Sequence, residues 1–141
     1  MGESALPDLQ QASRQRALLA QLEEQYRRPL RDLLAPRQLL KGSVYELKTR
    51  CGKPSCHCAT PEGPLHSTPV LSWSHAGQTR LRSLSASDLA RWRHLTEAYR
   101  RFRQARAHLV KLHQQILRAL DRLQQALLVP PPPPASRRPQ K

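Results

Sequence analysis

Residues 51–66 of the chain read CGKPSCHCATPEGPLH, and they hold all three of its cysteines. Structural zinc sites bind the ion tetrahedrally through four protein ligands, often three cysteines and a histidine. Gly52 and Pro54 bend the chain so that the first cysteine can reach the second, and the second and third share one side of an extended stretch. Three cysteines, two of them separated by one residue, argue against a disulfide framework. The segment therefore predicts one structural zinc ion per chain, bound by Cys51, Cys56 and Cys58.

A histidine is expected to complete the ligand set. His66 is favoured because the Pro-Glu-Gly-Pro turn at residues 61–64 can return the chain to the metal. His57 alternates away from the neighbouring cysteines and His75 falls in a predicted turn, so both are weaker candidates. Two alternatives stay open for the cysteines: they are free thiols buried as small apolar side chains, or they serve a redox or iron–sulfur role.

Segments with β-strand patterns lie on both sides of the cysteines. Residues 43–50 alternate apolar and charged side chains, as a half-buried strand does. Residues 70–74 and 79–84 also alternate, and residues 75–78 between them supply a turn in which Gly77 can take a positive φ. We therefore expect a β-hairpin that the first strand joins to form a small antiparallel sheet.

Helical patterns flank the sheet. From about residue 7 to residue 34, apolar side chains recur every three or four positions; Pro29 is expected to kink this helix and Pro36 to end it. After residues 85–88, which suit a helix N-cap and first turn, no glycine or proline occurs before Pro130. The apolar stripe of this second, long helix has a spacing near 3.5 residues, which predicts lengthwise packing on the N-terminal helix or on a second copy of itself. The stripe consists of Trp92, Leu95, Tyr99, Phe102, Ala105, Leu109, Leu112, Ile116, Leu120, Leu123 and Leu127.

The predicted fold is α+β and mostly helical. A small antiparallel sheet with a zinc-knuckle-like loop is flanked by an N-terminal helix and a long C-terminal helix that resembles a coiled coil. Only 4% of the residues are aromatic and 13 are prolines, so the core must be small. Small cores often need a metal ion, disulfides or partner chains to stay folded. We expect four parts: an N-terminal helical segment (1–40), a small β and zinc-knuckle-like module (41–86), a long basic amphipathic helix (87–129), and a disordered polyproline and basic tail (130–141).

The chain is strongly basic, with 24 Lys and Arg against 10 Asp and Glu and a formal net charge of +14. Such a charge produces a long-range positive field that attracts polyanions, above all nucleic acid. For the basic side chains of the long helix there is an alternative interpretation, in which they form the solvated outer face of a coiled coil instead of contacting nucleic acid. The candidate nucleic-acid-binding residues are Lys48, Arg50 and Lys53 near the cysteines and Arg100, Arg101 and Arg103 on the long helix.

These motifs together resemble a family of small, mostly bacterial proteins of unknown function. The family shares a CGKPxCxC segment, here residues 51–58, followed by a turn that contains a histidine, here His66. It also shares an SW strand, here Ser72-Trp73, and a G-x-TR hairpin return, here residues 77–80. The resemblance covers roughly residues 41–103 and includes the YRRFR stretch that begins at Tyr99.

The chain departs from the family pattern at two places. The family usually carries arginine where this chain has His57, and Gly-Pro-Tyr where this chain has Ser67-Thr68-Pro69. The family is similar in appearance to zinc-ribbon-like modules, and some members are associated with transposase neighbourhoods. The resemblance thus implies a zinc module and an association with mobile elements, but no activity.

An enzyme is not expected. No Ser-His-Asp order, phosphate-binding glycine loop or paired carboxylates occur, and four protein ligands would leave zinc no open position for water, so no small-molecule substrate is expected. The sequence lacks a signal-peptide pattern and an apolar run near 18 residues, which predicts a cytoplasmic protein without membrane contact. The predicted function is that of a zinc-binding, nucleic-acid-binding accessory protein. The alternative is a structural adaptor that oligomerises through its long helix, as a homodimer, and binds protein partners.

Overall fold

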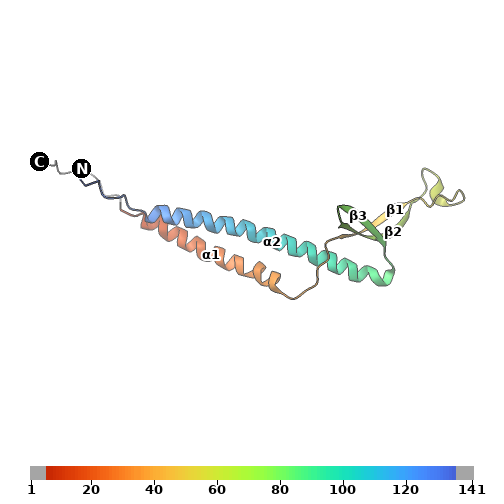
Figure 1. The fold of residues 1–141 in the computed structure, drawn as a ribbon, viewed down its shortest axis with the longest axis horizontal. Helices are drawn as coiled ribbons and strands as arrows, with labels where there is room; N and C mark the ends of the chain where they lie inside the picture. The colour runs from red at the N-terminus through yellow and green to blue at the C-terminus, as the bar shows by residue number, and fades with distance from the viewer. Residues whose placement is uncertain (1–5, 136–141) are drawn as a thin grey trace. The chain divides into compact units, whose positions relative to one another are not determined.

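The computed structural model describes residues 6–135, which form two α-helices and a three-stranded antiparallel sheet (Figure 1). The predicted α+β fold, with an N-terminal helix and a long C-terminal helix around a small sheet, is confirmed. The described residues divide into two compact units: residues 33–106, and a helical hairpin built from residues 6–32 and 107–135. The predicted basic tail at Arg137, Arg138 and Lys141 lies outside the described residues. The elements follow in the order α1 (Leu9–Leu34), β1 (Ser43–Thr49), the short 3-10 helix η1 (His57–Ala59), β2 (His66–His75), β3 (Gln78–Ser83) and α2 (Ala86–Leu127).

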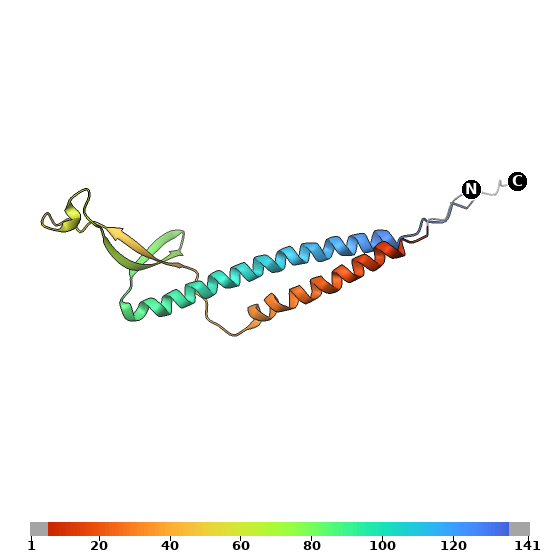
Figure 2. The same ribbon diagram turned by 180° about the vertical axis from the view of Figure 1, so that it is seen from behind.

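In the hairpin, α1 packs beside the C-terminal part of α2 (Figures 1 and 2). The backbone N–H of Asp8 donates to the carbonyl of Ala126 over 2.9 Å, which ties the start of α1 to the end of α2. Asp8 also caps α1, since its carboxylate accepts a hydrogen bond from the N–H of Gln11 at 2.9 Å. The core of the hairpin consists of Leu22, Leu112 and Ala119, with Leu18, Leu19, Tyr26 and Ile116 packed against it.

The predicted apolar stripe of α2 is wrong at its C-terminal end. Leu120 and Leu127 are 45% and 40% exposed, whereas Ala119 and Ala126 are 1% and 8% exposed. The α2 side chains that face α1 are thus alanines at these two levels, and an alanine lets two helices approach more closely than a leucine does. The row of α2 that packs in the hairpin consists of Leu109, Leu112, Ile116, Ala119, Leu123 and Ala126.

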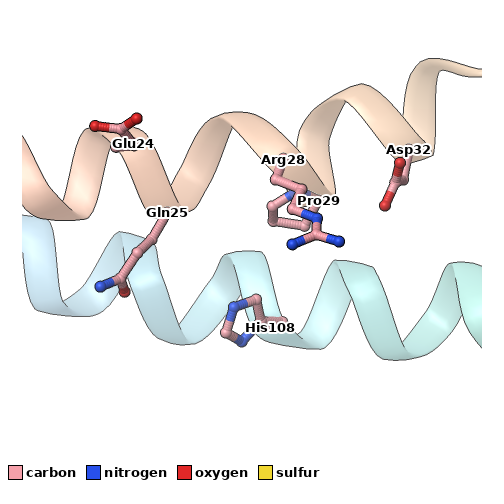
Figure 3. A pocket seen from close by; sticks show the side chains of 6 residues that line it. All are labelled: Glu24, Gln25, Arg28, Pro29, Asp32 and His108. Carbon is pink, nitrogen blue, oxygen red and sulfur yellow. The ribbon is translucent and has the colours of Figure 1, made fainter.

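Helix α1 continues through Pro29 to Leu34. A proline inside a helix has no N–H, so the carbonyl of Gln25 loses its intrahelical donor. Beside this position the hairpin has an open surface hollow of about 490 Å³, which Gln25 and His108 line from the two helices (Figure 3). The other lining residues are Glu24, Arg28, Pro29 and Asp32.

The sheet of the other unit has the strand order β1-β2-β3. Strand β1 pairs with β2 from Ser43 opposite Ser72 to Thr49 opposite His66, and this register decides where the cysteine loop leaves the sheet. The β2–β3 hairpin turns through two residues, Ala76 and Gly77, which both have positive φ, 50° and 75°. Two such residues make a type I′ turn, whose twist matches that of the strands.

Strand β2 runs over His66–His75 and is longer than the predicted 70–74. The additional residues include Pro69, although proline ordinarily argues against a central strand. The carbonyl of Pro69 accepts the N–H of Leu84 at 2.8 Å, so this edge of Pro69 faces the end of β3. In an antiparallel ladder the backbone N and O of one residue point to the same neighbouring strand. The N–H that Pro69 lacks would therefore have pointed towards β3, beyond the pair Val70–Ser83 at which the β2–β3 ladder ends. The proline therefore removes only a terminal hydrogen bond.

Helix α2 begins as its sequence indicates. The hydroxyl of Ser85 accepts a hydrogen bond from the N–H of Asp88 at 3.3 Å, and Asp88 lies in the positively polarised first turn. The core of this unit is small, because few large side chains are buried in it. Its buried apolar residues are Cys58, Val70, Leu71, Leu84 and Ala98.

Candidate metal centre

Three cysteines and a histidine meet at the end of the sheet where β1 and β2 separate. Cys51 follows β1 by two residues, and His66 is the first residue of β2, opposite Thr49. Cys56 and Cys58 lie on the intervening loop, before and within η1. The strand pairing therefore brings both stems of the loop together, and η1 presents the other two cysteines between them.

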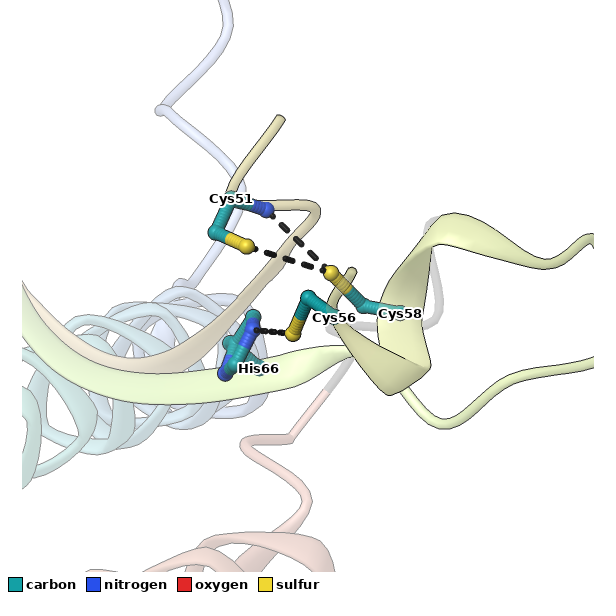
Figure 4. Close-up of side chains that lie close together, drawn as sticks. All are labelled: Cys51, Cys56, Cys58 and His66. Atoms are coloured by element: carbon teal, nitrogen blue, oxygen red, sulfur yellow. Dashed lines mark hydrogen bonds between the residues drawn. The ribbon is translucent and has the colours of Figure 1, made fainter. Parts of the chain in front are cut away.

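The four ligand atoms all lie within 4.8 Å of one another. Cys51 Sγ is 3.5 Å from Cys58 Sγ, and Cys56 Sγ is 3.2 Å from His66 Nε2 (Figure 4). Tetrahedral zinc with bonds of about 2.0–2.3 Å places its ligand atoms about 3.3–3.8 Å apart. Because the observed separations are close to these values, the cluster could hold a metal ion after small side-chain movements.

The two other candidate histidines are placed differently. His57 Nδ1 lies 3.7 Å from Cys56 Sγ, and the rings of His57 and His66 are 5.1 Å apart between centroids. His57 is exposed and does not belong to the group of four. His75 ends β2, nine residues from His66 and so about 30 Å along an extended strand.

The thiols differ in their surroundings. Cys58 is fully buried, Cys56 and His66 are half-buried, and Cys51 is exposed. The backbone N–H of Cys51 donates to Cys58 Sγ at 3.4 Å, and this hydrogen bond lowers the pKa of Cys58. The N–H of Lys53 lowers the pKa of Cys51, but the side-chain hydrogen bond with Cys58, partial loss of hydration and the neighbouring Cys56 thiol together leave that pKa raised. Cys58 is thus the thiol most disposed to act as a thiolate ligand.

The loop around the cluster is held by groups that sequence reasoning did not identify. The guanidinium of Arg50 donates to the carbonyls of Cys58 and Thr60, the latter over 2.8 Å. At Gly63 a Cβ atom would lie 1.8 Å from the carbonyl oxygen of His57, so no other residue fits without backbone movement. Arg50, which we expected to contact nucleic acid, therefore has its guanidinium turned to the loop backbone.

A family model described as a domain of unknown function (DUF6788) matches residues 9–94. The chain belongs to this family. The match extends from the first residue of α1 into α2 and includes Cys51, Cys56, Cys58 and His66. The predicted membership of a family of unknown function is confirmed. No curated protein and no solved structure matches the chain.

Apart from Arg50, the candidate nucleic-acid-binding residues are all exposed. They belong to the unit of residues 33–106, which holds 13 Lys and Arg against four Asp and Glu, a net charge of +9. Within residues 6–135 the structure has a single ion pair, Glu23 with Arg27, which lies in α1. Arg80 and Arg82 on the exposed strand β3 add to this basic surface and were missed from the sequence. The five expected residues are Lys48 on β1, Lys53 in the loop, and Arg100, Arg101 and Arg103 on α2.

In the part of the chain that the structure describes, neither helix has the length and apolar character needed to cross a membrane.

Proposed function

We propose that the chain is a non-enzymatic, nucleic-acid-binding accessory protein whose central unit is stabilised by one structural zinc ion. The observation that supports the metal most directly is the meeting of three thiols and one imidazole within 4.8 Å. Sulfur-rich sets select zinc, copper(I) or iron–sulfur clusters, and iron–sulfur clusters are generally held by four thiolates. Three thiolates with one imidazole therefore favour zinc.

Zinc here would act as a cross-link rather than a catalyst. Cys51, Cys56, Cys58 and His66 supply four ligands, which is the full coordination of a structural site and leaves no position for a substrate or water. The ion would join the ends of β1 and β2 to η1. The proposal of a non-enzyme rests on this complete ligand set.

Nucleic acid is the proposed partner because the Lys and Arg of residues 33–106 outnumber the acidic residues by nine and form no ion pair within this unit. Each Lys or Arg that contacts a phosphate releases condensed counterions, so the affinity of such a protein falls with salt. We name no element that must enter the major groove, and we expect weak sequence preference. An association with mobile elements remains part of this proposal.

The test is binding of the zinc-loaded protein to random-sequence DNA and RNA over a series of salt concentrations. If six or more phosphates are contacted, affinity should fall about a thousandfold or more between about 50 and about 200 mM salt. Replacing Arg100, Arg101 and Arg103 together by Gln should reduce the slope of log affinity against log salt by up to about three. No binding of the parent protein at low salt would refute the proposal.

The matched control replaces three exposed arginines of the hairpin, Arg14, Arg16 and Arg122, by Gln. It changes the net charge of the chain equally but leaves residues 33–106 intact. A salt slope that falls equally in both triple variants would mean that net charge, rather than the surface of residues 33–106, drives binding.

A second candidate function is a structural adaptor that oligomerises through α2 and binds protein partners. The observation that favours it is the exposure of Leu117 and Leu120, at 47% and 45%, on the part of α2 that belongs to the hairpin. An adaptor would self-associate yet show no salt-dependent affinity for DNA or RNA.

A further inference from the structure

Helix α2 carries a second row of residues at coiled-coil spacing beside the row that packs on α1. The gaps along this second row alternate between three and four residues, which is the heptad spacing of positions a and d. Its four apolar members are 40–47% exposed, and its two polar members are also exposed. We call it the outer row; it consists of Val110, His113, Leu117, Leu120, Gln124 and Leu127.

The outer row has the character of a contact surface rather than of a solvated face. A heptad row drifts only about 20° around a straight helix for each repeat, so its members form one continuous stripe. None of the six is charged, although Lys111, Arg118, Asp121 and Arg122 lie between them in the sequence. A stripe with four apolar side chains and no Lys, Arg, Asp or Glu is unfavourable to leave in water, and α1 leaves the four apolar members 40–47% exposed.

The order of residues in the outer row shows which partner fits it. When two copies of the row are placed antiparallel about a two-fold axis, each a position faces a d position of the other copy. Val110 then faces the partner's Leu127, and Leu117 faces the partner's Leu120. His113 faces the partner's Gln124, so the only two polar members meet and can share a hydrogen bond instead of being buried alone.

We propose that the outer row binds a second copy of this chain in an antiparallel, two-fold symmetric pair. In the parallel pairing His113 would face the partner's His113 and Gln124 the partner's Gln124, so the His113–Gln124 hydrogen bond between the two copies would be lost. The antiparallel pairing also brings Asp121, the one acidic residue of the row's neighbourhood, within about one turn of the partner's Arg118. The pair does not depend on metal or nucleic acid, because all of its residues belong to the helical hairpin.

The first test is the mass of the zinc-loaded full chain by sedimentation equilibrium over a wide range of concentration. The mass should rise from 16.1 kDa towards twice that value. Added salt should strengthen the pair, because its contacts are apolar and the two copies are both positively charged. A mass that stays at 16.1 kDa at every concentration overturns the proposal.

Replacing Leu117 and Leu120 together by Gln should raise the dissociation constant at least about a hundredfold, since four half-exposed leucines are lost from the pair. Both side chains are exposed in the single chain, so its folding should survive. The matched control is the double Gln variant of Leu9 and Leu34, two leucines of α1 that are 65% and 75% exposed. An equal loss in the control overturns the assignment to the outer row.

The orientation is tested by combining His113→Lys with Gln124→Glu. In the antiparallel pair each new lysine faces the partner's new glutamate, and the dissociation constant should fall a few-fold. In a parallel pair lysine would face lysine and glutamate would face glutamate, and the pair should weaken. The two changes cancel in formal charge, so a general charge effect cannot produce either result. A weaker pair overturns the antiparallel arrangement.

Discussion

Removal of the metal is expected to disorder residues 33–106 and to leave the helical hairpin folded. The core of this unit contains only three large apolar side chains that are well buried, Val70, Leu71 and Leu84, at 2%, 5% and 6% exposure. Burial of such side chains contributes about 1.5–3 kcal/mol each, so together they contribute roughly 5–9 kcal/mol. A structural zinc ion supplies about 10 kcal/mol or more, which is at least as much as the burial of these three side chains contributes.

The two tryptophans of the chain make this effect easy to observe. Trp73 lies on β2 and Trp92 on α2, and both belong to residues 33–106. A chelator should therefore shift their fluorescence to that of exposed indole, while circular dichroism at 222 nm retains the helical signal of α1 and of α2 beyond residue 106. Unchanged tryptophan emission after complete zinc removal would refute the reasoning.

Single substitutions sharpen the same prediction. Zinc content should be about one ion per chain in the parent protein, where Cys56 Sγ lies 3.2 Å from His66 Nε2. It should be close to zero in the Cys56→Ser variant, which lacks this sulfur. His57→Ala is the matched control, because His57 also lies beside Cys56 but outside the group of four. Equal zinc loss in both variants would show that the ligand assignment is wrong, and a parent protein without zinc after expression with zinc present would exclude the site.

Four further substitutions test the local geometry. Ala76→Asn should stabilise the zinc-loaded protein by about 1 kcal/mol in urea unfolding, because asparagine tolerates the φ of 50° at this type I′ position better than alanine does; no gain would contradict the turn assignment. Gly63→Ala should lower zinc affinity strongly, because the new Cβ would collide with the carbonyl oxygen of His57. Gly52→Ala is the comparison: its Cβ would meet no atom within 4 Å, so it should cost only about 1 kcal/mol of stability, for the φ of 78°. Equal effects of the two alanines would contradict this. Arg50→Gln should weaken zinc binding about tenfold in a competition titration, because two loop carbonyls lose their donor; an unchanged affinity would mean that Arg50 is free for other partners.

Several parts of the fold could be predicted because a local physical demand is written in the sequence. Gly77 indicates a turn with positive φ, and Ser85 indicates a helix N-cap, and both lie where they were expected. The C-terminal part of the α2 row could not be predicted in the same way. Hydrophobicity favours Leu120 over Ala119, but the choice between them depends on how closely α1 approaches, which is a property of the packed pair and not of either helix.

The extension of β2 through Pro69 shows the same limit. A proline argues against a central strand unless its missing donor falls at the end of a ladder, and this depends on the register with β3. Register emerges only when the strands pair. Sequence reasoning therefore began this strand four residues too late.

The candidate metal centre could be predicted in its composition but not in its support. Thiols and imidazoles are rare and chemically distinctive, so Cys51, Cys56, Cys58 and His66 can be grouped from spacing alone, and the structure brings these four together. Arg50 is one of 24 basic residues, and nothing local distinguishes an arginine that binds backbone carbonyls from one that binds phosphate. Its role depends on where the loop carbonyls point, which is known only after the loop has folded.

The distribution of charge gives a physical reason for a metal in this chain. Residues 33–106 carry +9 of the total +14, yet this unit has a very small apolar core. Self-repulsion among like charges destabilises a compact state, and a small core cannot offset it. A zinc ion would oppose this repulsion from within by cross-linking the strand ends, and a bound polyanion would oppose it from outside by neutralising the charge. If both proposals hold, nucleic acid should bind the folded unit in preference to the unfolded one and should slow the loss of zinc to a chelator, by the linkage that stabilises any state with a bound ligand.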